Sequence, residues 1–242
     1  MPADQPTILA TSGGAVADPR LRWRPGPLTE LAVDLAGVEG APKVCFLATA
    51  LGDDQGTIAA FYAAASARGW QPSHLQLFAM PNHADVAAHL LDVDVIWVWG
   101  GSVAGLLAMW RMHGVDAAMR TAWERGVVLT GVSAGSICWH SGGTTDSFGP
   151  ELQPITNGLG LLPYSNGVHY DSEEQRRPLF QSLIADGALP DGYATDDGAG
   201  LLYRGTEMVQ AYAERPSAGA YAVRRTAPGM VEETSLDVER LA

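Results

Sequence analysis

The stretch GVSAGSICWH, residues 131–140, places Ser133 between two glycines in the pattern G-x-S-x-G. It overlaps the apolar run VVLTGVS (127–133), which predicts a buried strand, and it continues into residues that can open a helix. A tight strand-to-helix turn projects a serine hydroxyl from the edge of a sheet and leaves helix N–H groups free for an oxyanion. We therefore interpret Ser133 as a nucleophile. Because glycine and serine are also common in ordinary turns, a purely structural turn is the alternative.

Short apolar runs alternate with helical patterns before this turn. The predicted strands are 7–14, 43–50, 74–80 and 94–101, and the predicted helices are 56–70, 84–93, 102–114 and 116–126. This order predicts an α/β fold, with a mainly parallel twisted sheet flanked by helices on both faces. In such sheets ligands bind at the carboxyl ends of the strands, where Ser133 is expected.

The second half of the chain is less regular. Residues 141–167 are rich in glycine and polar residues, and we expect a long irregular loop of the kind that carries function. A helix is predicted at 176–187, and the stretches 199–214 and 219–230 predict antiparallel hairpin strands at the C-terminal end. Because no linker interrupts the pattern, we expect a single domain over residues 1–242.

Composition excludes several classes of protein. A formal charge of −12, with only 15 Lys and Arg, argues against nucleic-acid binding. No stretch reaches the roughly 18 apolar residues of a membrane helix, and the first residues lack the pattern of a leader. With only Cys45 and Cys138, neither a disulfide framework nor a thiol metal cluster is expected. We expect a cytoplasmic protein, with an acidic surface compatible with a homodimer.

A serine nucleophile needs a base, and six histidines are available. Most have ordinary explanations in predicted strands, turns or helices: His74, His83, His89 and His113. His140 is expected on the helix after Ser133, pointing away from the turn. The remaining candidate is His169 in SNGVHYD, at the far end of the long irregular segment.

The residues alone leave the third member of a triad open. The order serine, acid, histidine leaves only Asp146 and Glu151 as acids. The order serine, histidine, acid offers Asp196 and Asp197 in YATDDGAG, and triads are defined by geometry rather than by chain order. An acidic pair in a turn is also a common capping feature, so both readings stay open.

Taken together, VWGGSVAGLL, GVSAGSICW, TTDSFGP, GVHYD and ATDDGAGL resemble, in this order, the peptidase E (aspartyl dipeptidase) family of serine peptidases, whose relatives include cyanophycinase. The resemblance spans roughly residues 7 to 225. It implies a flavodoxin-like fold similar to class I glutamine amidotransferases. The site residues that it implies are Ser133 as nucleophile, His169 as base, Asp197 as the third triad member, the amides of Gly101 and Ala134 as the oxyanion hole, and Gly100, Asp146 and Arg176 around the substrate.

Two positions depart from the family pattern: Ser102 follows Gly101 where Gly-Gly-Asn is common, and Val168 stands where proline is common. Neither removes a catalytic group, so the expected function is hydrolysis of short peptides, in particular dipeptides with N-terminal aspartate. No metal or organic cofactor is expected. The alternatives are another amide or ester hydrolase of the cyanophycinase type, or a catalytically silent binding protein. A glutamine amidotransferase needs a cysteine at the turn, whereas Cys138 lies five positions downstream.

Overall fold

Parallel strands form the centre of the molecule. The computed structural model describes residues 3–242 and contains an eight-stranded sheet in the order β16-β13-β12-β1-β7-β6-β4-β5. Its strands are β1 (Thr7–Thr11), β4 (Lys43–Leu47), β5 (Gln71–Leu75), β6 (Val95–Val98), β7 (Val128–Val132), β12 (Ala199–Arg204), β13 (Glu207–Ala213) and β16 (Val238–Arg240). The five strands from β1 to β5 in this order are mutually parallel, as the sequence pattern predicts.

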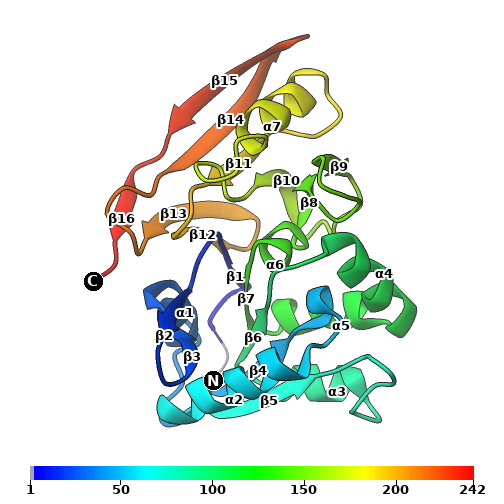
Figure 1. The fold of residues 1–242 in the computed structure, drawn as a ribbon, viewed down its shortest axis with the longest axis vertical. Helices are drawn as coiled ribbons and strands as arrows, with labels where there is room; N and C mark the ends of the chain where they lie inside the picture. Colours follow the sequence, from blue (N-terminus) through cyan, green and yellow to red (C-terminus); the bar gives the residue numbers. More distant parts are fainter. Residues whose placement is uncertain (1–2) are drawn as a thin grey trace.

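Helices cover both faces of the parallel strands, as expected (Figure 1). The helices are α1 (Pro27–Asp34), α2 (Gln55–Ala67), α3 (Val86–Leu91), α4 (Val103–His113), α5 (Val115–Glu124), α6 (Ala134–Ile137) and α7 (Arg176–Ala185), with a short 3-10 helix at Thr49–Leu51. Alternate residues of β4 separate the two faces: Phe46 packs in the core under α1 and α2, whereas Leu47 packs in the core under α3, α4 and α5. Both side chains are fully buried.

A second, six-stranded sheet lies beyond the C-terminal strands of the first, in the upper part of Figure 1. It has the order β15-β14-β11-β10-β8-β9, and α7 packs against it. Its strands are β8 (His140–Thr145), β9 (Gln153–Ile155), β10 (Leu162–Gly167), β11 (Gly192–Thr195), β14 (Ala220–Ala227) and β15 (Met230–Ser235). A separate two-stranded hairpin consists of β2 (Ala15–Asp18) and β3 (Arg22–Pro25).

The expectation of an irregular loop over 141–167 was wrong, because this segment supplies most of β8 together with β9 and β10. Its glycines suit close strand packing rather than loop flexibility: a Cβ at Gly143 would lie 2.3 Å from Asn166 O of the neighbouring strand. The expected antiparallel pairs near the C-terminus are confirmed, as β12 with β13 and β14 with β15.

The predicted strand over 74–80 is also misplaced, because β5 ends at Leu75. Beyond it, the backbone N–H groups of Leu77 and Phe78 donate to the carboxylate of Asp53, at 2.5 and 2.9 Å, instead of to a neighbouring strand. Among the helices described within residues 3–242, none combines the length and apolarity needed to cross a bilayer.

Candidate active site

Three neighbouring strands of the large sheet end at the same edge. In the order β1, β7, β6 they lead into Ser12, Ser133 and the Gly100–Gly101 turn. Because β1, β7 and β6 are parallel, the three segments lie side by side at their carboxyl ends, the usual ligand-binding edge of such sheets.

Ser133 occupies a strained turn between β7 and α6. Its φ and ψ are 57° and −113°, a conformation that side-chain-bearing residues adopt at a cost of about 1–3 kcal/mol. The flanking glycines are required sterically: a Cβ at Gly131 would lie 2.3 Å from Gly135 O, and one at Gly135 would lie 2.3 Å from Val98 O. This geometry distinguishes the segment from an ordinary turn and resembles the nucleophile elbow of hydrolases.

His169 and Asp197 form a direct contact. Asp197 Oδ1 lies 2.5 Å from His169 Nδ1. When Nδ1 carries the proton of the neutral ring, Nε2 is the nitrogen that can accept one. The backbone of His169 is left-handed, with φ 53°, and its N–H donates to Ser12 Oγ at 3.3 Å. Both side chains are partly exposed, so a substrate can reach the pair.

The neighbouring acid, Asp196, faces the other way. Its Oδ2 accepts hydrogen bonds from Gly219 N–H at 2.8 Å and from Tyr221 Oη at 3.1 Å. Burial raises the pKa of the Asp196 carboxyl above its ordinary value, although the Gly219 amide acts in the opposite direction. The structure therefore brings Asp197, not Asp196, to the imidazole.

The segments of Ser133 and His169 are tied to consecutive residues at the end of β1. Ser133 N–H donates to Thr11 O at 3.1 Å, and His169 N–H donates to the side chain of Ser12. Within residues 3–242 no hydrogen bond joins Ser133 Oγ to the His169 ring. Such contacts are often long in enzymes without substrate and tighten when substrate binds.

The Gly100–Gly101 turn lies against Ser133 through Gly100. A Cβ at Gly100 would lie 3.2 Å from Ser133 Cβ, and Gly101, with φ 130°, would place one 2.4 Å from Ala50 O. The turn is held by Ser102 N–H, which donates to Ala50 O at 2.9 Å. In residues 3–242 the backbone hydrogen bonds include none donated by the N–H groups of Gly101 and Ala134.

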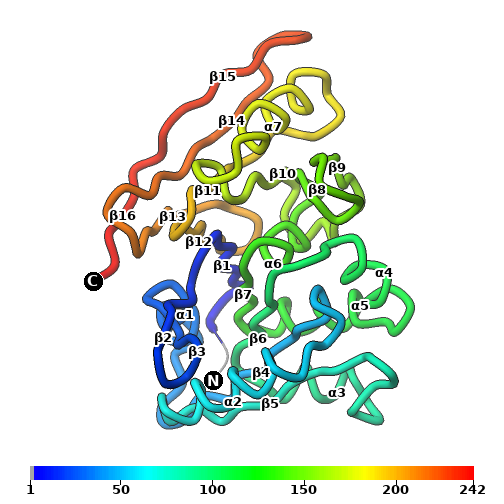
Figure 2. The backbone as a smooth tube through the Cα atoms, viewed as in Figure 1, coloured from blue at the N-terminus to red at the C-terminus, as the bar shows by residue number. Residues whose placement is uncertain are grey.

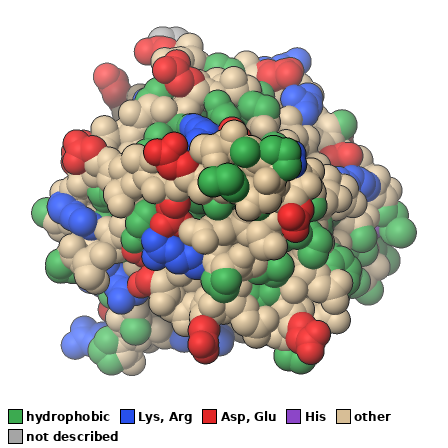
Figure 3. All heavy atoms as spheres, turned by 90° about the horizontal axis from the view of Figure 1, so that it is seen from above, with side chains coloured by type: hydrophobic (Ala, Val, Ile, Leu, Met, Phe, Trp, Pro, Cys, Tyr) green, Lys and Arg blue, Asp and Glu red, His purple; other side chains and the backbone are tan. Residues whose placement is uncertain are grey.

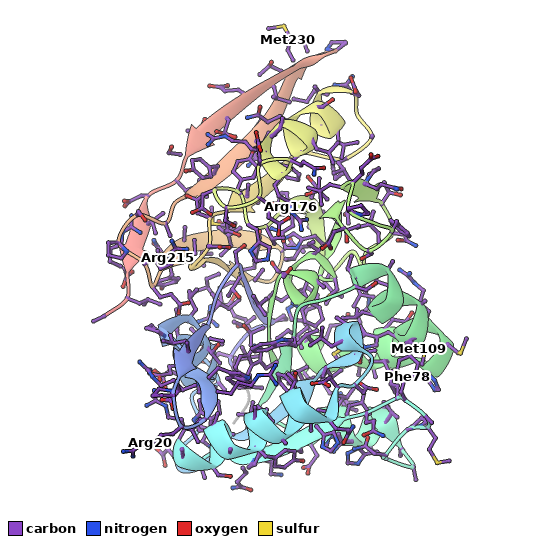
Figure 4. The ribbon with its side chains drawn as sticks, viewed as in Figure 1. Arg20, Phe78, Met109, Arg176, Arg215 and Met230 are labelled. Carbon is purple, nitrogen blue, oxygen red and sulfur yellow. The ribbon has the colours of Figure 1, made fainter. Side chains whose placement is uncertain are left out.

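The two remaining predicted substrate residues, Asp146 and Arg176, differ in exposure. Asp146 is exposed and lines a cavity of about 540 Å³ together with Glu173 and Glu174. Arg176 is buried at the start of α7, between that helix and the strands beneath it (Figure 4). Its guanidinium donates to Thr144 O and, at 2.7 Å, to the Glu173 carboxylate, so in this structure its contacts lie within the protein.

Hydrogen bonds join the segments around the cavity to the start of α4 and to the histidine loop. Ala104 N–H, just after the Gly100–Gly101 turn, donates to Ser147 Oγ at 3.3 Å. On the other side, Glu173 N–H donates to His169 O at 3.1 Å. The segments around the cavity are therefore held to the first turn of α4, which follows the glycine turn, and to the histidine loop.

Cys138 and His140 are removed from the site. Cys138 is fully buried and its Sγ donates to Gly135 O at 3.4 Å, while burial raises the pKa of its thiol well above the ordinary value. The expectation that His140 lies on the helix after Ser133 was wrong, because α6 ends at Ile137 and His140 begins β8. Burial lowers the pKa of His140 to about 4.

Sequence reasoning did not identify several groups around the pair. Asp171 accepts the N–H of Asp197 at 2.8 Å, Arg215 Nη1 donates to Asp197 O at 3.2 Å, and Ser12 supports His169. Ser12 carries the one usable signal, since it lies beside the glycines that end the predicted strand over 7–14, at the same sheet edge as Ser133. In residues 3–242, no group of three or more His, Cys, Asp and Glu side chains has the arrangement of a metal site.

Comparison with known proteins identifies the family of the chain. The model of peptidase family S51 matches residues 8–211. The Bacillus subtilis (strain 168) protein named "Uncharacterized peptidase YgaJ" is 44% identical over 182 residues, which cover 75% of this chain and 78% of that protein. "Peptidase E" of Shewanella denitrificans (strain OS217 / ATCC BAA-1090 / DSM 15013) is 29% identical over 143 residues, covering 55% and 60%.

The fold has matches among solved structures as well. The crystal structure of a peptidase from an acI-B1 Actinobacterium superposes with a TM-score of 0.66 at 16% identity, over 96% of this chain and 97% of that one. At this identity the similarity concerns the fold alone. From the family match and the 44% identical relative, the chain belongs to peptidase family S51 and is a serine-type peptidase.

Proposed function

We propose that this peptidase hydrolyses short peptides with a Ser133–His169–Asp197 triad. The observation that carries the proposal is the 2.5 Å contact between His169 Nδ1 and Asp197 Oδ1, at the sheet edge that also holds the strained Ser133. With the Nδ1 proton donated to Asp197, Nε2 presents its lone pair and acts as the base that takes the Ser133 proton.

The subsequent steps follow from the same geometry. Ser133 Oγ attacks the peptide carbonyl carbon, and the oxyanion is stabilised by the N–H groups of Gly101 and Ala134. His169 then gives its proton to the leaving amine, which departs as the C–N bond breaks. Water, deprotonated by His169, hydrolyses the acyl-enzyme and restores Ser133.

We further propose that the substrates have a free N-terminus, with dipeptides bearing N-terminal aspartate as the first candidates. The carboxylates of Asp146, Glu173 and Glu174 suit the α-ammonium of such a peptide. The resemblance to peptidase E supports aspartate as the N-terminal residue, and Arg176 is the proposed partner of its side chain. That role requires Arg176 to exchange contacts with Thr144 O and Glu173 for contacts with the substrate.

The acidic lining of the cavity favours a second candidate, a substrate whose N-terminal residue is basic. The cationic side chain of such a residue is attracted by the carboxylates of the cavity, whereas an aspartate side chain is repelled by them. A panel of X-Leu dipeptides, with Asp, Glu, Asn, Gly, Leu and Arg as X, separates the two. Wild type and Ser133→Ala are compared, with N-acetyl-Asp-Leu as the control for the α-ammonium.

Cleavage of Asp-Leu alone, lost in Ser133→Ala and absent for the acetylated peptide, supports the aspartyl dipeptidase. Preference for Arg-Leu supports the basic alternative. If no dipeptide is cleaved but a fluorophosphonate labels Ser133, another amide or an ester is the substrate. Absence of labelling supports the silent binding protein.

We also propose a cytoplasmic location, for which the buried thiols of Cys45 and Cys138, which form no disulfide, are the support.

A further inference from the structure

Behind His169 lies a cluster of polar and aromatic side chains contributed by the C-terminal hairpin and α7. In Figure 2, β14 and β15, in orange to red, run beside α7, in yellow. Glu233 of β15 is the acceptor at its centre: it accepts hydrogen bonds from Tyr170 Oη at 2.7 Å, from Gln181 Nε2 at 2.8 Å, and from Arg177 Nη2. Glu233 lies outside residues 8–211, the part matched by the family model.

Glu233 and Tyr170 are largely buried, and the side chains of the cluster pack against one another. The Glu233 side chain is 14% exposed, and Tyr170 is 3% exposed. The Arg177 guanidinium lies over the rings of Tyr170 and Tyr221, 5.2 and 5.0 Å from their centroids. Burial alone would raise the pKa of Glu233, but the hydrogen bonds from Tyr170, Arg177 and Gln181 outweigh it, so the pKa is lowered and the carboxylate stays charged.

Tyr170 connects this cluster to the imidazole, because it directly follows His169. The left-handed backbone of His169 persists only if its neighbours hold it, since such a conformation is costly for a residue with a side chain. On one side Ser12 accepts the His169 N–H; on the other, Tyr170 N–H donates to Thr195 O at 3.1 Å and its phenol is fixed by Glu233. The direction of the imidazole toward Asp197 therefore depends on where Tyr170 is held.

The same cluster touches the acid. Tyr221, whose ring centroid lies 5.5 Å from that of Tyr170, donates its Oη to Asp196, the residue before Asp197. We propose that Glu233 is a positioning residue of this peptidase: through Tyr170 it holds His169 in the orientation that faces Asp197. The inference rests on the proposed role of His169 as the base.

Four variants test the role. Glu233→Ala removes the acceptor, Tyr170→Phe removes only the hydroxyl that binds it, and Glu233→Gln keeps an oxygen that can accept from Tyr170. Glu232→Ala is the matched control, because Glu232 is the exposed neighbour on the same strand. The first readout is the rate constant for fluorophosphonate labelling of Ser133, with melting temperatures measured in parallel.

Glu233→Ala and Tyr170→Phe are expected to slow labelling by about tenfold or more, since small displacements of a catalytic group can cost up to about 10²-fold. Glu233→Gln is expected to recover the rate to within about threefold of wild type, and Glu232→Ala to match wild type. The double variant Glu233→Ala/Tyr170→Phe should label no more slowly than the slower single variant, because both remove one interaction.

The second readout is amide hydrogen exchange, which does not require a reactive serine. Faster exchange at His169 and Tyr170 in Glu233→Ala, with β6 unchanged, is expected. Wild-type labelling and unchanged local exchange in both Glu233→Ala and Tyr170→Phe would overturn the positioning role. Exchange that rises equally throughout the chain would overturn it too, because Glu233 would then stabilise the fold only. If wild type labels no faster than Ser133→Ala, the proposed nucleophile fails instead, and local exchange alone decides the role of Glu233.

Discussion

Replacing Asp197 with asparagine isolates the contribution of the acid to the proposed triad. Asp197 has one strong side-chain contact, the 2.5 Å contact of Oδ1 with His169 Nδ1. Its Oδ2 lies 3.9 Å from Arg215 Nη1, and the Arg215 side chain is 52% exposed, so this ion pair contributes little. Almost the whole effect of the substitution should therefore pass through His169.

Asparagine is close in shape to aspartate but can present an N–H group to Nδ1. The imidazole then carries its proton on Nε2 and cannot accept the proton of Ser133. In a Ser-His-Asp protease the same change lowers kcat by about 10⁴-fold, and we expect a loss of about 10³- to 10⁴-fold here. At about 1.4 kcal/mol per factor of ten, this corresponds to about 4–5.5 kcal/mol of transition-state stabilisation.

Asp196→Asn provides the matched control in the adjacent position. Its amide oxygen can still accept from Gly219 N–H and Tyr221 Oη, so we expect a loss of less than about tenfold. The assay is kcat/KM on the best dipeptide, or the rate of fluorophosphonate labelling if no dipeptide is cleaved, with melting curves for both variants. Equal losses in the two variants, or a larger loss for Asp196→Asn, would refute the assignment of Asp197.

Three further predictions concern stability. Ser133→Gly should abolish activity and stabilise the fold by about 1 kcal/mol, since glycine adopts the positive φ freely; an unchanged or lower unfolding free energy would contradict the strain at Ser133. Gly135→Ala should cost about 1–3 kcal/mol or more because its Cβ meets Val98 O, whereas Gly105→Ala within α4 should change stability by less than about 1 kcal/mol; denaturant melts compare them. Burial lowers the pKa of His140 from 6.5 to about 4, so the unfolded chain binds a proton at this imidazole more tightly than the folded chain does. The free energy of unfolding should therefore fall by about 3 kcal/mol as the pH falls from about 6.5 to 4. The free-energy difference between pH 7 and pH 4 should shrink by this amount in His140→Asn, and an equal difference in both proteins would show that His140 does not titrate on unfolding.

The β14–β15 end of the molecule carries mixed charges rather than one sign. Seen from above in Figure 3, acidic and basic side chains are scattered among hydrophobic and other groups. Met230 lies exposed at the tip of the hairpin (Figure 4), while Glu233, three residues later, is largely buried against α7. The hairpin thus turns one face to solvent and uses the other to support the histidine loop.

Local patterns predicted four of the five parallel strands, with β5 as the exception. Largely apolar runs bounded by glycine turns correctly predicted strands such as β6 and β7, because strands buried on both faces carry few polar side chains. The G-x-S-x-G turn could be predicted for a related reason. Gly135 lies so close to Val98 O that no side chain fits there, and this steric requirement for glycine is visible in the local sequence.

Pairings between distant segments could not be predicted in the same way. Strands β8 and β10 contain glycine and polar residues, and they are strands because each supplies the hydrogen bonds of the other. The prediction for residues 74–80 was wrong for the converse reason. The apolar run predicted a strand, but the backbone N–H groups of Leu77 and Phe78 donate to the Asp53 carboxylate instead of to a neighbouring strand.

The sequence by itself determined which residues can carry the chemistry and the parallel α/β frame on which they stand, because both depend on short-range steric and apolar patterns. Only the tertiary structure showed that Asp197, and not Asp196, contacts His169, since adjacent side chains point in different directions and their surroundings come from remote strands. It also placed Glu233 behind His169, 63 residues away from its partner Tyr170. A contact of this kind leaves no local pattern, because its energy depends on a partner that only folding brings near.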